Sequence, residues 1–210
     1  MRIVFPLYPR FTALDAIGPY EVLSRLPGAE VVFAAVEPGP VTTDTGALTV
    51  LAETALADIT DCDVVVVPGG PGCLEAGRDA AYTGWLAAVH PKTRWTASVC
   101  SGSLLLGAAG ILDGLPATSH WAVAETLPMF GAIPTPRRTV FTGRIVTAAG
   151  VASGIDMALA LAAELTDRET AESIQLFIEY DPQPPFDTGS PAKAPASMVE
   201  RVRDQVMADV

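Results

Sequence analysis

The segment Val64–Val67 is the part of the chain that most limits its possible folds. It consists of four consecutive valines, so both faces of this strand carry apolar side chains. Such a strand is typical of a parallel sheet with helices on either side, because a sheet with one wet face alternates apolar and polar residues. Four further runs of strand-forming residues fit the same sheet: Ile3–Phe5, Val31–Val36, Thr96–Val99 and Ile145–Ala148.

Helical patterns alternate with these predicted strands. The alternation predicts an α/β fold, with a mostly parallel sheet covered by helices on both faces. Pro19 is expected in the first turn of its helix, where a missing N–H costs nothing. Gly46–Ala52 is predicted to form a further strand or an edge hairpin. The predicted helices are Tyr20–Leu26, Gly84–Val89, Ser103–Ala109, Ile155–Leu165 and Ala171–Glu179.

Two proline-rich regions interrupt the alternation. Pro128–Arg138 is expected to loop over the surface. Asp181–Pro191 is expected to form an irregular arm, since a proline-rich segment near the end of a domain is usually a linker or an arm along a neighbouring surface. A last helix is predicted around Ala196–Val206. We find no internal repeat, and we predict a single domain over residues 1–210.

Composition and charge exclude several classes of protein. Half of the 210 residues are hydrophobic, so the chain is not disordered. The net charge of −11 argues against a nucleic-acid partner, which needs a basic face. No apolar run is long enough to span a membrane, and the N-terminus lacks a signal-peptide pattern. Three cysteines without metal-type spacing fit a reducing cytoplasm, and no metal is expected.

Cys100 is the strongest candidate for a catalytic residue. It lies between the strand-like segment that ends at Val99 and a predicted helix that begins near Gly102. A thiol at the start of a helix is exposed to the positive end of the helix dipole, which favours the thiolate. Gly102 permits a tight strand-to-helix turn of the kind that presents nucleophiles in hydrolases. The alternative is a buried, unreactive cysteine.

Two other loops follow predicted strands and carry residues that suit a site. In an open α/β sheet, ligands bind beyond the carboxyl ends of the strands. Gly69 and Gly70 follow Val67, and their backbone N–H groups can serve as an oxyanion hole. Asp15 is a single carboxylate in an apolar stretch. It is either a helix N-cap or, if it faces Cys100, a proton shuttle whose pKa is raised by burial.

Few other residues of the chain suggest chemistry. His120, in Ala117–Trp121, is either a base for Cys100 or polar packing beside a tryptophan. Cys62 lies between two aspartates, whose charge disfavours a thiolate. Cys73 follows the glycine-rich loop and could lie near the pocket, but it is interpreted as structural.

Several segments together resemble the ThiJ/PfpI superfamily, namely Val64–Gly72, Ser98–Gly102 and Ala149–Met157. That superfamily has a flavodoxin-like α/β sandwich related to class I glutamine amidotransferases. The resemblance covers nearly the whole chain and is sharper for the isocyanide hydratase branch. The segments that resemble this branch are Leu14–Val22, Ala117–Trp121 and Gln175–Phe186.

The resemblance implies roles for the matched residues. Cys100 corresponds to the nucleophile, Asp15 to its acidic partner, and Gly69 and Gly70 to the oxyanion side of the pocket. Ser101 stands where the branch usually has threonine, and it keeps the hydroxyl; the peptidase branch has histidine there, which argues against a Cys-His protease. Two further matched residues, Gly150 and Val151, face the nucleophile across the pocket. A homodimer is implied, and the proline-rich arm is a candidate for its interface.

The reaction that the resemblance implies is hydration of an isocyanide to an N-substituted formamide through a thioimidate, with no cofactor and with a small molecule as the only ligand. A glyoxalase-type activity on 2-oxoaldehydes is one alternative, although relatives with that activity usually carry glutamate in place of Asp15. The other alternative is a non-enzymatic redox or ligand sensor, because an accessible thiolate oxidises readily.

Overall fold

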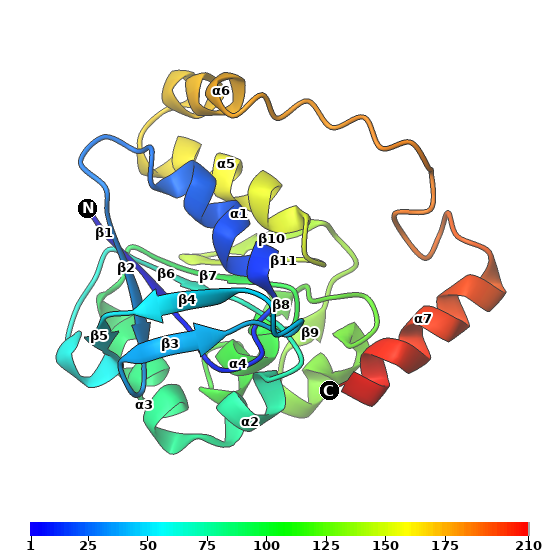
Figure 1. Ribbon diagram of the computed structural model, residues 1–210, viewed down its shortest axis with the longest axis horizontal. Coiled ribbons are helices and arrows are strands. Elements are labelled where there is room, and N and C mark those ends of the chain that lie inside the picture. The colour runs from blue at the N-terminus through cyan, green and yellow to red at the C-terminus, as the bar shows by residue number, and fades with distance from the viewer. Residues whose placement is uncertain (210) are drawn as a thin grey trace.

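A seven-stranded sheet forms the centre of the molecule. We describe residues 1–209 from a computed structural model (Figure 1). The strand order is β10-β11-β7-β6-β1-β2-β5, and all neighbours are parallel except β10 and β11. These strands are β1 (Arg2–Pro6), β2 (Glu30–Ala35), β5 (Thr54–Ala55), β6 (Val64–Val67), β7 (Trp95–Val99), β10 (Thr139–Thr142) and β11 (Ile145–Ala148). The predicted mostly parallel α/β sheet is confirmed.

Helices cover both faces of this sheet. In Figure 1, α1, α5 and α6 lie above it, and α2, α3 and α4 lie below it. None of the helices of residues 1–209 is long and apolar enough to cross a membrane. The helices are α1 (Ala13–Leu23), α2 (Cys73–Arg78), α3 (Ala80–Val89), α4 (Gly102–Ala108), α5 (Ser153–Leu165), α6 (Arg168–Phe177) and α7 (Ala196–Asp209), with 3-10 turns η1 (Leu56–Asp58), η2 (His90–Lys92) and η3 (Ala124–Phe130).

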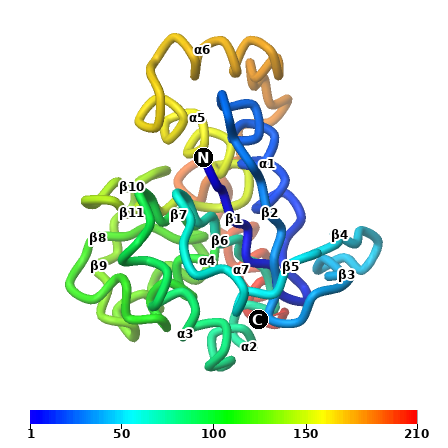
Figure 2. Tube along the Cα trace, turned by 90° about the vertical axis from the view of Figure 1, so that its left-hand side faces the viewer, coloured from blue at the N-terminus to red at the C-terminus, as the bar shows by residue number. Residues whose placement is uncertain are grey.

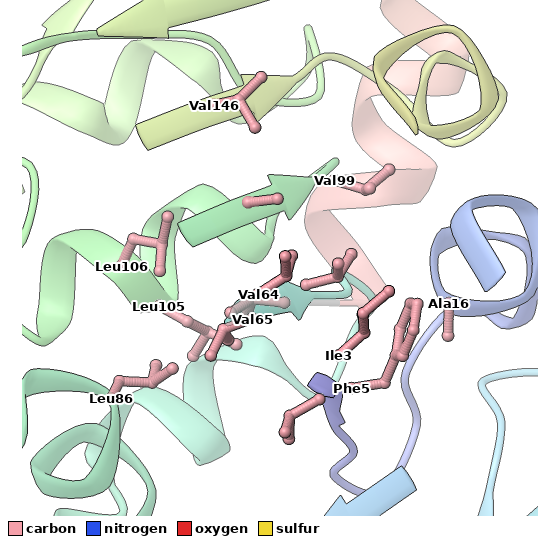
Figure 3. Close-up of a cluster of buried hydrophobic side chains, with 14 of the residues drawn as sticks. Ile3, Phe5, Ala16, Val64, Val65, Leu86, Val99, Leu105, Leu106 and Val146 are labelled. Atoms are coloured by element: carbon pink, nitrogen blue, oxygen red, sulfur yellow. The ribbon is translucent and has the colours of Figure 1, made fainter. Parts of the chain in front are cut away.

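The core occupies both sides of the sheet. Figure 3 shows Ile3, Phe5, Val64 and Val65 from the central strands among side chains of the surrounding helices. All four valines of β6 are fully buried, as the apolar run predicts. This burial on both faces fixes β6 between β1 and β7, where it can be covered from either side.

Two details of the sequence prediction are wrong. Pro19 lies inside α1 and not in its first turn, because α1 begins at Ala13. The helix tolerates the proline because Gly18 and Pro19 are buried against α5: a side chain on Gly18 would meet Ile155, and one on Gly154 would meet Pro19. The region around Pro128 is not a simple loop, since it contains η3 and the short strand β9 (Ile133–Pro134), which pairs with β8 (Pro116–Ala117).

Gly46–Ala52, predicted to be a strand or an edge hairpin, belongs to a hairpin outside the main sheet. Its second strand, β4 (Thr49–Ala52), pairs antiparallel with β3 (Gly39–Thr42). Figure 2 shows this hairpin projecting beside β2. The turn between its strands contains Asp44. A hydrogen bond from Asp44 N to Phe11 O, at 3.0 Å, holds this turn against the segment between β1 and α1.

The end of the chain forms the predicted arm and helix. Residues 181–189 are all exposed, and α7 has no buried residue. Figure 1 shows the arm leaving α6 and passing around the molecule to α7. The far end of α7 contacts the body again, where Arg10 Nη2 donates to Asp209 O at 3.0 Å and the Arg203 guanidinium lies 5.7 Å from the centre of the Trp121 ring.

A buried hydroxyl ties the helices below the sheet to β1. Tyr82 of α3 is 1% exposed, and its hydroxyl donates to Pro6 O at 2.9 Å. We expect Tyr82→Phe to lower the free energy of unfolding by about 1–3 kcal/mol, because the buried carbonyl loses its partner. Urea unfolding measures this change. Tyr20→Phe is the matched control with an expected effect within about 0.5 kcal/mol. Equal effects of the two substitutions would contradict the importance of this bond.

Candidate active site

Four neighbouring strands bring the predicted site residues to one edge of the sheet. The strands β11, β7, β6 and β1 are adjacent, and all four are parallel. Their carboxyl ends therefore meet at one edge. The loops that follow them carry Gly150 and Val151, Cys100, Gly69 and Gly70, and, at the start of α1, Asp15. The strand order of the sheet therefore brings these loops together.

Cys100 occupies a strained turn between β7 and α4. Its φ is +58°, in the left-handed region that L-residues other than glycine seldom adopt. Its N–H is held by the carbonyls of Ala148 and Ala149 at 3.1 and 2.9 Å, and its carbonyl accepts from Ser119 Oγ at 3.0 Å. Gly102 is required behind it, because a Cβ there would collide with the carbonyl of Val67. Backbone strain of this kind is often found at active sites, so it supports a functional role for Cys100.

Asp15 faces Cys100 and is not the N-cap of α1. Thr12 occupies the cap position, and Asp15 lies in the first turn, fully buried. Asp15 Oδ2 accepts from Gly69 N at 2.9 Å. Asp15 Oδ1 is buried without a hydrogen-bond partner among the described nitrogen and oxygen atoms, and the carboxyl interacts with the Cys100 thiol. A buried carboxyl left with a free oxygen beside a thiol is well placed to exchange a proton.

Burial raises the pKa of both partners. The pKa of Asp15 rises to about 7, mainly through loss of water, against the stabilising effect of the Gly69 N–H on the carboxylate. The pKa of the Cys100 thiol is also raised by burial and by the charge of Asp15, while the N–H groups of Val151 and Ser101 lower it. The Ser101 N–H at the start of α4 favours the thiolate, as the sequence predicts, but burial and the charge of Asp15 outweigh it. Near neutral pH the two groups compete for one negative charge.

The glycine loop holds the site together. Gly70 N donates to Ser101 Oγ at 2.9 Å, and Gly69 N donates to Asp15. A Cβ on Gly69 would lie 2.5 Å from Ser101 N, so the loop can approach the nucleophile turn only as glycine. In this conformation both N–H groups have acceptors. They position Asp15 and Ser101 and are not free to bind an oxyanion, which differs from the sequence expectation.

Across the cavity, Gly150 and Val151 approach Cys100 as the resemblance implied. Val151 N–H bonds to the Cys100 sulfur. A Cβ on Gly150 would lie 2.8 Å from His120 Cδ2, so glycine leaves room for the imidazole.

His120 lies at the cavity in a neutral form. Burial lowers its pKa, and His120 Nδ1 accepts from Ala122 N at 3.3 Å, which assigns the proton of the neutral ring to Nε2. Its ring centre is 5.5 Å from that of Trp121. His120 therefore packs beside the tryptophan, as one of the two sequence alternatives predicts, and it lines the cavity of Cys100, where a role as a base stays a prediction.

The other cysteines lie outside this cavity and are buried and unpaired. Burial raises the pKa of Cys62 to about 12 and also raises that of Cys73. Neither thiol lines the cavity, and the charges of Asp63 and Asp61 add to burial in raising the pKa of Cys62, as the sequence predicts.

The cavity at Cys100 has a volume of about 200 Å³. The sequence analysis gave no role to six of its lining residues: Thr12, Asp44, Pro71, Val123, Val206 and Asp209. Asp44 comes from the hairpin turn, and its only sequence signal is a turn-forming context of Thr43, Thr45 and Gly46. Val206 and Asp209 come from α7, more than one hundred residues beyond Cys100. The local sequence of α7 does not predict that these two residues lie at the cavity.

The chain belongs to the DJ-1/PfpI family, whose model matches residues 1–164. It is 43% identical over 203 residues to the isonitrile hydratase of Pseudomonas putida, covering 97% of this chain and 89% of the relative. It is 26% identical over 163 residues to the glutathione-independent glyoxalase DJR-1.2 of Caenorhabditis elegans, covering 77% and 86%.

Solved structures agree with this assignment. A ThiJ/PfpI family protein from Pseudomonas syringae superposes with a TM-score of 0.95 at 40% identity, covering 99% of this chain and 86% of that one. The DJ-1β structure from Drosophila melanogaster, with a TM-score of 0.76 at 23% identity over 85% of this chain and 97% of that one, shares the fold.

The raised pKa of Asp15 predicts a pH-dependent effect on stability. The folded protein binds the Asp15 proton more tightly than the unfolded chain does, so ionisation of Asp15 destabilises the fold as pH rises from about 4 to about 7. Relative to the wild type, Asp15→Asn should become more stable over that range by about 3 kcal/mol, at 1.36 kcal/mol per pKa unit.

Urea unfolding of both proteins at pH 4.5 and 7.5 measures this difference. Asp58→Asn, at an exposed residue, is the control for loss of one negative charge, with an expected effect within about 0.5 kcal/mol. A stability difference between the wild type and Asp15→Asn that stays constant with pH would show that Asp15 does not titrate in this range.

Proposed function

We propose that the protein hydrates isocyanides to N-substituted formamides, with Cys100 as nucleophile and Asp15 as proton shuttle. The observation that carries the proposal is the buried Asp15 carboxyl, with a pKa of about 7, beside the strained Cys100. The relationship to the Pseudomonas putida isonitrile hydratase supports the choice of substrate class. The chemistry requires one nucleophile and one group that both gives and takes a proton near neutral pH.

In the first step the thiol proton passes to the Asp15 carboxylate, and the Cys100 sulfur attacks the terminal carbon of the isocyanide. A C–S bond forms, and Asp15 delivers its proton to that carbon. The product is a thioimidate, R–N=CH–S–Cys100, with Asp15 ionised. The N–H groups of Val151 and Ser101 stabilise the thiolate before it attacks.

In the second step the Asp15 carboxylate takes a proton from water as the water oxygen attacks the thioimidate carbon. That proton goes on to the nitrogen, which leaves R–NH–CH(OH)–S–Cys100. Collapse of this intermediate breaks the C–S bond, expels the thiolate and returns the hydroxyl proton to Asp15. One water has been added, the product is the formamide, and both residues are restored.

Loss of the Cys100 thiol should abolish turnover. We expect Cys100→Ala to reduce kcat for an aryl isocyanide by at least about 10⁴-fold, because no other group can form the thioimidate. Formation of the formamide, followed by chromatography at pH 7.5, measures the rate. Cys62→Ala is the control: it removes a thiol outside the cavity and should keep the wild-type rate. Wild-type turnover by Cys100→Ala would overturn the mechanism.

The two alternative functions give different outcomes in parallel assays. A glyoxalase would turn over methylglyoxal in preference to the isocyanide, and the Caenorhabditis elegans relative makes this the second candidate. A sensor would show neither activity, and mild peroxide would convert Cys100 to sulfenic acid, detected by mass spectrometry.

We also propose that the protein acts as a homodimer in the cytoplasm. The arm, residues 181–191, has an exposed Phe186, and the end of α6 exposes Leu176 and Phe177. Large apolar side chains at such levels of exposure are typical of interaction surfaces when they cluster. We expect light scattering to give twice the monomer mass, and a monomer at micromolar concentration would contradict the proposal.

A further inference from the structure

The charged side chains that line the cavity at Cys100 are all acidic. Asp44 and Asp209 line it, and Asp15 is buried next to Cys100. Among residues 1–209 no lysine or arginine lines this cavity, and His120 is neutral. Arg10 reaches its rim, but the bond from Arg10 Nη2 goes to the backbone carbonyl of Asp209 and not to a carboxylate.

Asp44 is held in place by two donors. Thr12 Oγ1 donates to Asp44 Oδ2 at 2.8 Å, and Thr45 N donates to Asp44 Oδ1 at 2.8 Å. Both bonds stabilise the ionised carboxylate. The charge of Asp44 reaches the reacting groups, because it raises the pKa of Asp15. Asp44 is therefore a fixed negative charge facing the space that the substrate must enter.

We propose that Asp44 makes the site selective against anions, so that the substrate is a small isocyanide without a carboxylate or phosphate on its side chain. This inference rests on the proposed function and narrows its substrate class. A cavity of about 200 Å³ holds the equivalent of about seven waters, which limits the side chain to a small group.

The physical reason is uncompensated repulsion. A carboxylate on the substrate would share a cavity of about 200 Å³ with the Asp44 carboxylate, and charges shielded from bulk water interact more strongly than charges in it. No cation of the described lining offsets that repulsion. Discrimination by an unfavourable contact is a common source of specificity.

The test compares methyl isocyanoacetate with the isocyanoacetate anion, which share the reacting group and differ in charge. We expect wild-type kcat/KM to favour the ester by at least about tenfold, and Asp44→Asn to reduce that ratio at least about fivefold. The ratio isolates the charge effect, because any change in the pKa of Asp15 acts on both substrates. Asp58→Asn controls for long-range effects of net charge and should leave the ratio unchanged. A wild-type ratio near one, or a ratio unaffected by Asp44→Asn, would overturn the inference.

A second measurement does not depend on isocyanide turnover. Cys100 is alkylated with neutral iodoacetamide and with anionic iodoacetate, and the ratio of rates is compared with that of glutathione. We expect the ratio at Cys100 to exceed the glutathione ratio at least about tenfold and to fall in Asp44→Asn. Equal ratios would overturn the charge selectivity. If neither isocyanide were hydrated, the proposed function would fail, and the alkylation ratios would still decide the inference about Asp44.

Discussion

The hydrogen bond from Gly69 N–H to the Asp15 carboxyl is the interaction on which the site depends. It is the one bond to a described nitrogen or oxygen atom that this fully buried carboxyl makes, and it spans the loops that follow β6 and β1. This bond and the interaction with the Cys100 thiol stabilise the carboxylate less than burial destabilises it, so the pKa settles at about 7. A further donor on Oδ1 would lower the pKa, so that Asp15 would be almost fully ionised at neutral pH and would have no proton to give. The reactivity of the pair thus follows from incomplete hydrogen bonding.

The close approach of loops at this edge depends on residues without side chains. Gly69 lies against Ser101, Gly102 against the carbonyl of Val67, and Gly150 against His120. At each of these positions a Cβ would force two of the loops apart. The parallel strands bring the loops to the same edge, and the absence of side chains lets them touch. The sheet alone would leave the nucleophile exposed to water, where Asp15 would keep its ordinary pKa.

The sequence predicts those parts of the fold and the site that depend on neighbouring residues only. Four adjacent valines identify β6, and a cysteine before glycine at the end of a strand identifies the nucleophile turn. The pKa of Cys100 was beyond such reasoning, because the helix dipole is a local effect whereas burial and the charge of Asp15 depend on the whole fold. Asp44, Val206 and Asp209 were missed for a related reason. They reach the cavity on a hairpin outside the main sheet and on a helix at the end of an exposed arm. The local sequence around Asp44, Val206 and Asp209 does not indicate that these residues lie at the cavity.

The left-handed backbone of Cys100 has a consequence for how this protein can change by mutation. A side chain in that conformation costs roughly 1–2 kcal/mol that glycine would not incur. Drift from cysteine to glycine would therefore relieve backbone strain while removing the nucleophile. Stability and chemistry pull in opposite directions at this one residue, and only selection for the reaction keeps a thiol there. A descendant released from that selection would be expected to lose the cysteine early while the surrounding fold persists.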